Sequence, residues 1–119
     1  MALSEKLPIY RDTYRLLCLL HPLVQEFPKY YKYSLGVRMA DLALDMVILV
    51  YKINSSQDKL EPINEFMYRY RSFVVLMRLC VEQHVVSIRK YAEIACLLES
   101  ISRQATGWKQ YIEGQNKKQ

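Results

Sequence analysis

The residue types that most often carry catalysis are sparse in this sequence, and they lie far apart. His21 and His84 are the only histidines, and they fall in different segments. A single histidine on a helix is more often structural or solvated than a ligand or a general base. The sequence has no HExxH, no zinc-type Cys/His spacing, no glycine-rich phosphate loop and no GxSxG. It therefore predicts no enzymatic activity, no catalytic residue, no cofactor and no small-molecule substrate.

Two carboxylates do share a helical face, because Asp41 and Asp45 are four residues apart. Such a pair could hold a metal in a carboxylate bundle, but those bundles also need ExxH sets from other helices. The residues before His84 do not supply one, and Arg38 and Lys52 lie on the same stripe as the carboxylates. Local ion pairs are therefore expected instead of a metal site. A carboxylate-bridged metalloenzyme is the alternative, which elemental analysis of the purified protein would test.

A basic and aromatic stretch, FPKYYKYSLG at residues 27–36, has three tyrosines beside Lys29 and Lys32. Tyrosine rings can stack on the bases of a single strand. They can equally close the end of a helix bundle, with the ring inward and the hydroxyl in water. We expect the rings to pack and the two lysines to stay outside. Gly36 falls inside a helical pattern, which suggests the close approach of a neighbouring helix.

The net charge of +5 favours polyanions or an acidic protein face as partners, although a solvated face without a function explains it equally well. Nucleic-acid backbones are bound by clustered lysine and arginine. The candidates for such contacts come in pairs along the chain: Arg11, Arg15, Lys29, Lys32, Arg71, Arg78, Arg89 and Lys90. No RNP motif, GxxG loop, zinc finger or helix-turn-helix signature accompanies them, so the signal of one chain is weak. Repetition of each patch in an oligomer would strengthen it.

Apolar residues recur with the helical period in four segments, and only three glycines and four prolines interrupt the chain. The predicted helices span about residues 8–26, 32–53, 60–83 and 87–113, with Ser87 as the N-cap of the fourth. Short joints between four helices predict an all-α, antiparallel, up-down-up-down four-helix bundle. We expect one domain over residues 1–114 and a disordered basic tail over residues 115–119.

The second predicted helix is apolar around most of its circumference, whereas a bundle helix in a monomer normally keeps a broad polar face. We therefore expect it to pack against another subunit as well as its own core. The alternative is a central, fully surrounded helix, which is hard to arrange with four helices. The predicted interface residues share an apolar side chain within this helix: Leu35, Met39, Leu42, Met46, Leu49 and Val50.

The three cysteines are an odd number without a CxxC pair, which is typical of a reduced, intracellular protein. The longest apolar run, residues 42–51, is interrupted by Asp45 and is too short to span a bilayer. The first residues show no apolar signal core. The sequence thus predicts a cytoplasmic protein without a membrane partner.

Several stretches together resemble a known family. They are IYRDTYRLL, LHPLVQEFP, KYYKYSLGVRM, the helix end YKINSS, LMRL, SIRKYAEI and a late GW. This pattern resembles the accessory variability determinant (Avd) proteins of diversity-generating retroelements. It is also similar to the wider group of four-helix proteins encoded in bacterial ribosomal RNA intervening sequences. The similarity covers about Lys6 to Trp108, and FPKYYKYSLG and NSS are its most specific parts.

The resemblance implies a four-helix bundle that assembles as a homopentameric, barrel-like ring with a basic surface. It implies binding to a reverse transcriptase and to template RNA, and possibly to DNA, in support of mutagenic retrohoming into a variable gene. Family members are not enzymes. The family's basic positions on the third helix map onto Arg78, but Val74 stands one turn earlier where an arginine is expected, with Arg71 nearby as a substitute.

The relatives from intervening sequences share the fold without a settled role, so the fold does not decide between the two groups. The alternative function is therefore a structural four-helix bundle oligomer whose basic face meets only protein.

Overall fold

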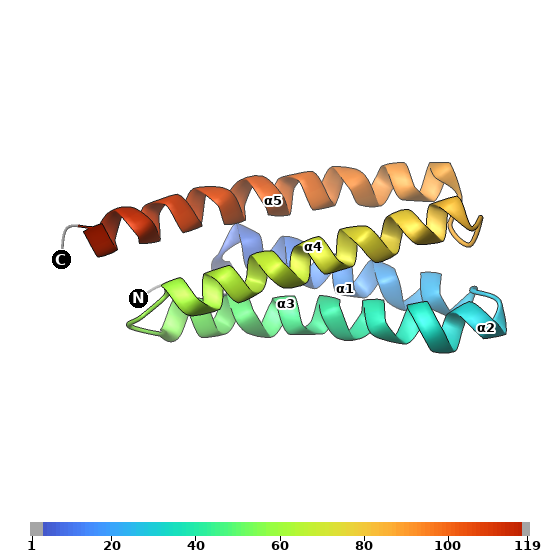
Figure 1. The fold of residues 1–119 in the computed structure, drawn as a ribbon, viewed down its shortest axis with the longest axis horizontal. Helices are drawn as coiled ribbons and strands as arrows, with labels where there is room; N and C mark the ends of the chain where they lie inside the picture. The colour runs from blue at the N-terminus through green and yellow to red at the C-terminus, as the bar shows by residue number, and fades with distance from the viewer. Residues whose placement is uncertain (1–3, 118–119) are drawn as a thin grey trace.

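The computed structural model describes residues 4–117, and every secondary-structure element in that range is helical. The expected all-α bundle of four long helices is confirmed, in a rod of 50 × 23 × 22 Å (Figure 1). The elements in chain order are the 3-10 turn η1 (Ser4–Lys6), α1 (Pro8–Gln25), α2 (Lys29–Tyr31), the π-helix η2 (Lys32–Gly36), α3 (Val37–Ser55), α4 (Leu60–Glu82) and α5 (Ile88–Lys117).

Consecutive long helices are antiparallel neighbours, so the bundle has the predicted up-down-up-down order. α3 packs against α1 and α4, and α5 closes the bundle by packing against α4 and α1. The α1–α2 connection and the α4–α5 turn therefore lie at the same end of the rod, at the right of Figure 1. The α3–α4 turn and the C-terminal end of α5 lie at the opposite end.

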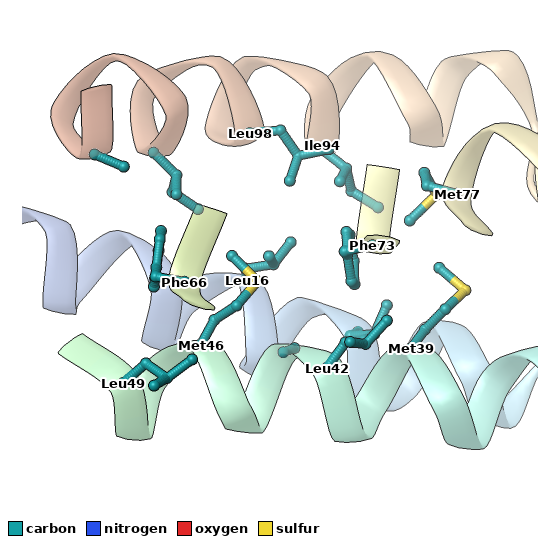
Figure 2. Packing of buried hydrophobic residues seen from close by; sticks show 14 of the residues in the cluster. Leu16, Met39, Leu42, Met46, Leu49, Phe66, Phe73, Met77, Ile94 and Leu98 are labelled. Atoms are coloured by element: carbon teal, nitrogen blue, oxygen red, sulfur yellow. The ribbon is translucent and has the colours of Figure 1, made fainter. Parts of the chain in front are cut away.

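The core runs along the axis of the bundle and is built from large apolar side chains of all four long helices. Leu16, Met39, Phe66, Phe73 and Met77 each have no exposed surface (Figure 2). The apolar spacing of the sequence predicted these inward faces. Burial of such side chains is the main driving force of a bundle of this size.

The seams on either side of α5 include polar contacts. Asp12 of α1 accepts hydrogen bonds from Ser100 Oγ at 2.9 Å and Gln104 Nε2 at 2.7 Å. On the other side, the Tyr70 hydroxyl of α4 donates to the Leu98 carbonyl at 3.0 Å, and burial raises the pKa of this tyrosine. These bonds fix the position of α5 along the bundle axis relative to α1 and α4.

The second helical run begins three residues earlier than predicted, at Lys29, and continues without interruption to Ser55. Its first turns pass through the π-helix η2, which ends at Gly36. A Cβ atom at Gly36 would lie only 2.5 Å from Val24 Cγ1 and 3.4 Å from Phe27 Cδ2. The expected close approach at this glycine is therefore present, and the neighbour is the C-terminal end of α1.

The C-terminus of α4 closes in a Schellman motif with a histidine where glycine is usual. The Val85 N–H donates to the Cys80 carbonyl at 2.8 Å, and the His84 N–H donates to the Val81 carbonyl at 3.0 Å. His84 has a φ of 61°, in the left-handed region. L-residues other than glycine adopt this region at a cost of roughly 1–2 kcal/mol.

α5 begins where the sequence predicts and ends later than predicted. Ser87 Oγ accepts the Lys90 N–H at 3.1 Å, which confirms the predicted N-cap. α5 continues through Gly114 to Lys117, so residues 115–117 of the predicted tail are helical in the structure. A glycine inside a helix costs only about 1 kcal/mol, and Ile112 is buried in the turn before it. Residues 118 and 119 of the predicted tail lie outside the described residues.

Replacement of Gly36 by alanine tests the close contact between α1 and α3. We expect Gly36→Ala to lower the free energy of unfolding by about 1–3 kcal/mol, because the added methyl group overpacks against Val24. Gly107→Ala is the matched control, since nothing lies within 4 Å of its Cβ position in α5. It should raise the free energy of unfolding by about 0.5–1 kcal/mol. Urea unfolding at one protein concentration measures both, and equal stabilisation by the two variants would contradict the contact.

The left-handed residue in the α4–α5 turn gives a second stability test. His84→Gly should raise the free energy of unfolding by about 0.5–1 kcal/mol, because relief of the backbone strain exceeds the added entropy of the unfolded chain. The adjacent Gln83→Gly should lower it by a similar amount, since Gln83 has a φ of −86° and gains nothing from glycine. Thermal unfolding followed by circular dichroism compares the two, and a loss of stability in His84→Gly would rule out the strain.

Candidate nucleic-acid interface

Four of the predicted cationic residues gather at one end of the bundle. Lys29 is the first residue of α2 and Lys32 the first of η2, while Arg89 and Lys90 lie in the first turn of α5. The up-down topology brings these two chain segments to the same end (Figure 1). We call these four residues the basic end.

A hollow of about 630 Å³ lies at this end of the bundle, between the end of α1 and the α4–α5 turn. It is lined on one side by Leu23 and Glu26 from the end of α1, and on the other by Val86 and Lys90 from the α4–α5 turn and α5. The turn that precedes Lys29 and the turn that precedes Arg89 are therefore neighbours in space.

The basic end is also the place where two helical runs begin. The N-terminus of a helix carries a partial positive charge and unpaired backbone N–H groups, so carboxylates are favoured there and cations are disfavoured. Neither α2 nor α5 has an acidic residue in its first turn. α1 and α4 end at the same place, and their C-termini carry a partial negative charge, so the net positive charge there comes from the side chains. These cations and the unpaired N–H groups of the two helix starts make this end suited to bind anions.

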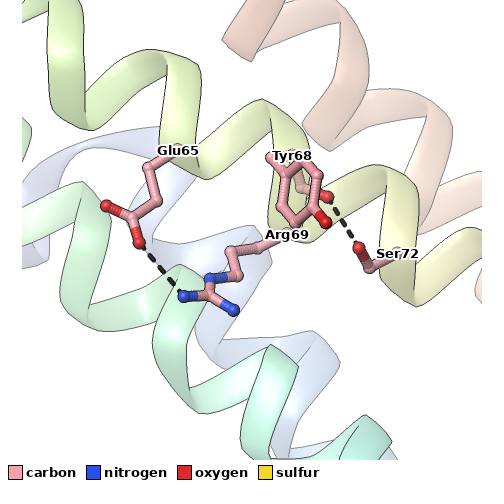
Figure 3. Close-up of polar contacts among 4 residues, drawn as sticks. All are labelled: Glu65, Tyr68, Arg69 and Ser72. Carbon is pink, nitrogen blue, oxygen red and sulfur yellow. Dashed lines mark hydrogen bonds and ion pairs between the residues drawn. The ribbon is translucent and has the colours of Figure 1, made fainter.

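Few carboxylates neutralise these cations. Lys90 Nζ lies 3.4 Å from Glu93 Oε2, in an exposed pair of the kind that contributes about 0–1 kcal/mol. Among residues 4–117 the other ion pair joins Arg69 and Glu65 (Figure 3), so Lys29 and Arg89 have no ion pair. Lys29 and Arg89 are exposed, whereas Lys32 and Lys90 are half-buried, so two of the four cations are open to solvent and without an ion pair.

The tyrosines of this end divide into two groups. Tyr31 is half-buried and packs on the core, as expected, with its ring edge-on to Tyr30 at 5.2 Å between centroids. Tyr30 and Tyr33 instead remain 77% and 67% exposed. Lys32 Nζ lies 6.0 Å from the centroid of the Tyr33 ring. Two aromatic rings thus project into solvent beside the lysines.

The other predicted cationic residues lie elsewhere. Arg71 and Arg78 are exposed on α4, on either side of the exposed Val75. Arg11 and Arg15 are exposed on α1, and Arg15 precedes the end of that helix by about 15 Å at a rise of 1.5 Å per residue. The eight candidates therefore form three separate groups, of which only the basic end combines cations from two segments.

A single chain already buries most of the predicted subunit interface. Five of its six residues are buried in the core of a single chain and offer no surface to a second copy: Met39, Leu42, Met46, Leu49 and Val50. The sixth, Leu35, is half-buried against that core. The wide apolar arc of α3 is real, but its exposed members are others, which sequence reasoning missed: Val37, Leu44, Ile48 and Tyr51.

Other reactive groups are dispersed. Cys80 is buried with its Sγ 3.6 Å from Met39 Sδ, and burial raises the pKa of its thiol to about 11, which makes it unreactive. Cys18 and Cys96 are exposed on α1 and α5. Residues 4–117 contain no group of three or more histidines, cysteines and carboxylates that could hold a metal ion. In the same part of the chain, no helix is both long and apolar enough to cross a bilayer.

Comparison with known proteins supports the resemblance seen in the sequence. A family model described as bAvd-like matches residues 6–112, nearly the whole chain. A search of curated proteins returns no match. Proteins of this family are accessory proteins of diversity-generating retroelements and are not known as enzymes. The chain belongs to the bAvd-like family.

Proposed function

We propose that this protein is a non-enzymatic accessory subunit of a diversity-generating retroelement, which binds template RNA at its basic end and supports the reverse transcriptase in mutagenic retrohoming. The observation that carries the proposal is the coincidence of four cations and two helix N-termini at one end of the bundle. Family membership supports the reverse transcriptase as partner.

The position of the cations argues for a polyanionic ligand. Each cation near a helix N-terminus destabilises the free protein, by about 0.3–1 kcal/mol where exposed. A bound phosphate backbone is attracted both to the cations and to the helix N-termini, so their proximity becomes favourable in the complex. Binding also releases counterions from the nucleic acid. Lys29, Lys32 and Arg89 therefore lie where they weaken the free protein and strengthen a complex.

The exposed aromatic rings favour single-stranded segments. Tyr30 and Tyr33 flank Lys32, so a backbone held by the lysines places its bases within reach of the two rings. Stacking of a base on an aromatic side chain contributes about 1–3 kcal/mol and tolerates any base. DNA of the same form would be bound by the same groups.

Self-association would multiply this surface. A single basic end presents few charges, but an assembly of copies presents one basic end per subunit to the same RNA. The second contact then becomes intramolecular, and the apparent affinity rises without any new type of contact.

Neutralisation of the basic end should weaken RNA binding and reduce its salt dependence. For the combined variant Lys29→Gln, Lys32→Gln, Arg89→Gln and Lys90→Gln, the slope of log K against log salt should fall by up to about 3 for single-stranded RNA, at about 0.7 per lost phosphate contact. The control has the same charge change at exposed sites elsewhere: Lys6→Gln, Lys52→Gln, Arg103→Gln and Lys117→Gln. Fluorescence anisotropy at several salt concentrations measures both.

The same titration distinguishes the alternatives. Equal slopes for the two combined variants would refute the basic end as the RNA site. Separate variants of Arg71 with Arg78, and of Arg11 with Arg15, then show whether α4 or α1 binds instead. A wild-type protein without RNA affinity at ~0.15 M salt would favour the structural oligomer with a protein-only partner.

A stability measurement tests the electrostatic argument independently of RNA. Lys90 occupies the third helical position after the Ser87 cap, where glutamine or glutamate completes a capping box. Lys90→Gln should therefore raise the free energy of unfolding by about 0.5 kcal/mol while RNA affinity falls. Lys52→Gln, in the last turn of α3, removes a favourable charge and should lower it by a few tenths. Urea unfolding checks both, and a loss of stability in Lys90→Gln would contradict the argument.

A further inference from the structure

Side-chain hydrogen bonds tie α5 to its neighbours only as far as residue 104. The last of them along the chain is donated by Gln104 Nε2 to Asp12 of α1, at 2.7 Å. Within the described residues, no side-chain hydrogen bond or ion pair joins residues 105–117 to another element. Apolar packing alone therefore holds the last turns of α5 on the bundle.

That packing involves few side chains. Ala105 and Ile112 are buried, and Trp108 is half-buried against the core. The part of the helix before residue 105 makes the hydrogen bonds and also buries three large apolar side chains: Ile94, Leu98 and Ile101. The attachment of α5 is therefore weaker over its last turns than over its first ones.

α1 does not cover the last turns of α5. Pro8, the first residue of α1, lines a hollow of about 270 Å³ together with Trp108. α5 continues from there to Lys117, which is about 13 Å at a rise of 1.5 Å per residue, and its end extends past the start of α1 (Figure 1). A second hollow, of about 840 Å³, lies between these turns and the α3–α4 turn. The last turns of α5 are thus flanked by two hollows.

Two glycines weaken the same part of the helix without a packing reason. Nothing lies within 4 Å of the Cβ position at Gly107 or at Gly114, whereas the close contact with α1 leaves no room for a Cβ atom at Gly36. A glycine inside a helix favours the unfolded chain, because its backbone loses more freedom on folding than that of any other residue. Gly107 follows Gln104 by three residues, so the helix becomes weak where its hydrogen bonds to α1 end.

From these observations we propose that residues 107–117 form a lid, which undocks from the bundle as a unit while residues 88–104 stay in place. Undocking moves Trp108 away from the start of α1 and exposes Ile9, which is 5% exposed in the docked form. Segments with few buried contacts are the ones that open locally in a folded protein. The lid lies at the end of the rod opposite the basic end, so its opening does not depend on RNA binding.

The emission of Trp108 reports the undocking directly, because this residue is the single tryptophan of the chain. On addition of urea, the emission should shift to longer wavelength before the helical circular dichroism is lost, since the lid opens before the bundle unfolds. Two transitions that coincide would show all-or-none unfolding and would overturn the proposal.

Two isoleucines of α5 provide a matched pair of variants, since Ile112 is 3% exposed in the lid and Ile101 is 0% exposed before it. Ile112→Ala should lower the urea midpoint of the Trp108 emission and leave the midpoint of the circular dichroism nearly unchanged. Ile101→Ala should lower both midpoints. Equal shifts of the two midpoints in Ile112→Ala would show that the lid unfolds only with the bundle, which contradicts a separate opening.

Hydrogen exchange locates the boundary of the lid without denaturant. Backbone amides of residues 108–113 should exchange at least about tenfold faster than those of residues 94–104, although both stretches are helical. Gly107→Ala combined with Gly114→Ala should slow the exchange of residues 108–113 by on the order of tenfold. Even protection from residue 94 to residue 112, with loss only in the last turn, would reduce the lid to ordinary fraying and overturn the proposal. The RNA titration of the basic end is unaffected by either outcome.

Discussion

The contact between Gly36 and the end of α1 sets the geometry on which the rest of the structure depends. Val24 approaches so closely that no Cβ atom fits at residue 36, and the helix containing this glycine passes through a π-turn at that point. The α1–α2 connection can therefore be short, because the two helices already touch where the chain reverses. This short reversal holds Lys29 and Lys32 against the end of the bundle instead of on a long loop.

The two ends of the rod differ in the side chains that begin their helices, since each end holds two helix N-termini and two C-termini. At the basic end, two helical runs begin with cations and without carboxylates, and the cap that an acidic residue could complete is left with a lysine. The usual preference for acidic residues in the first turn of a helix is therefore not followed at either helix start. Deviations of this kind are expected where a protein binds a ligand. The sides of the rod also differ, since large exposed apolar side chains are more frequent on α3 and α4 than on α1 and α5.

The sequence was sufficient for the helices and their order, because few glycines and prolines interrupt the periodic segments. It missed the start of the second helix, since Pro28 and the tyrosine-rich stretch after it are typical of a linker, and no propensity indicates a π-turn. It also did not show which apolar residues of α3 a single chain leaves exposed. A helix that is apolar all round does not show which side its own core will cover, and that choice depends on the packing of α1 and α4. For the cations, the residues were visible in the sequence, but their relation to two helix N-termini required the exact helix starts.

The Schellman motif and the Ser87 cap have a consequence for how tightly the basic end would hold the nucleic acid proposed as its ligand. Hydrogen bonds of the α4–α5 turn and of the Ser87 cap fix the main chain around Arg89 and Lys90 in the free protein. Association then costs the ordering of long side chains but not the ordering of a main chain, which disordered basic arms must undergo on binding. The tight turn between α4 and α5 thus holds the first turn of α5 in a fixed position. The backbone strain at His84 is the cost of this turn, and the smaller loss of main-chain entropy on binding is its benefit.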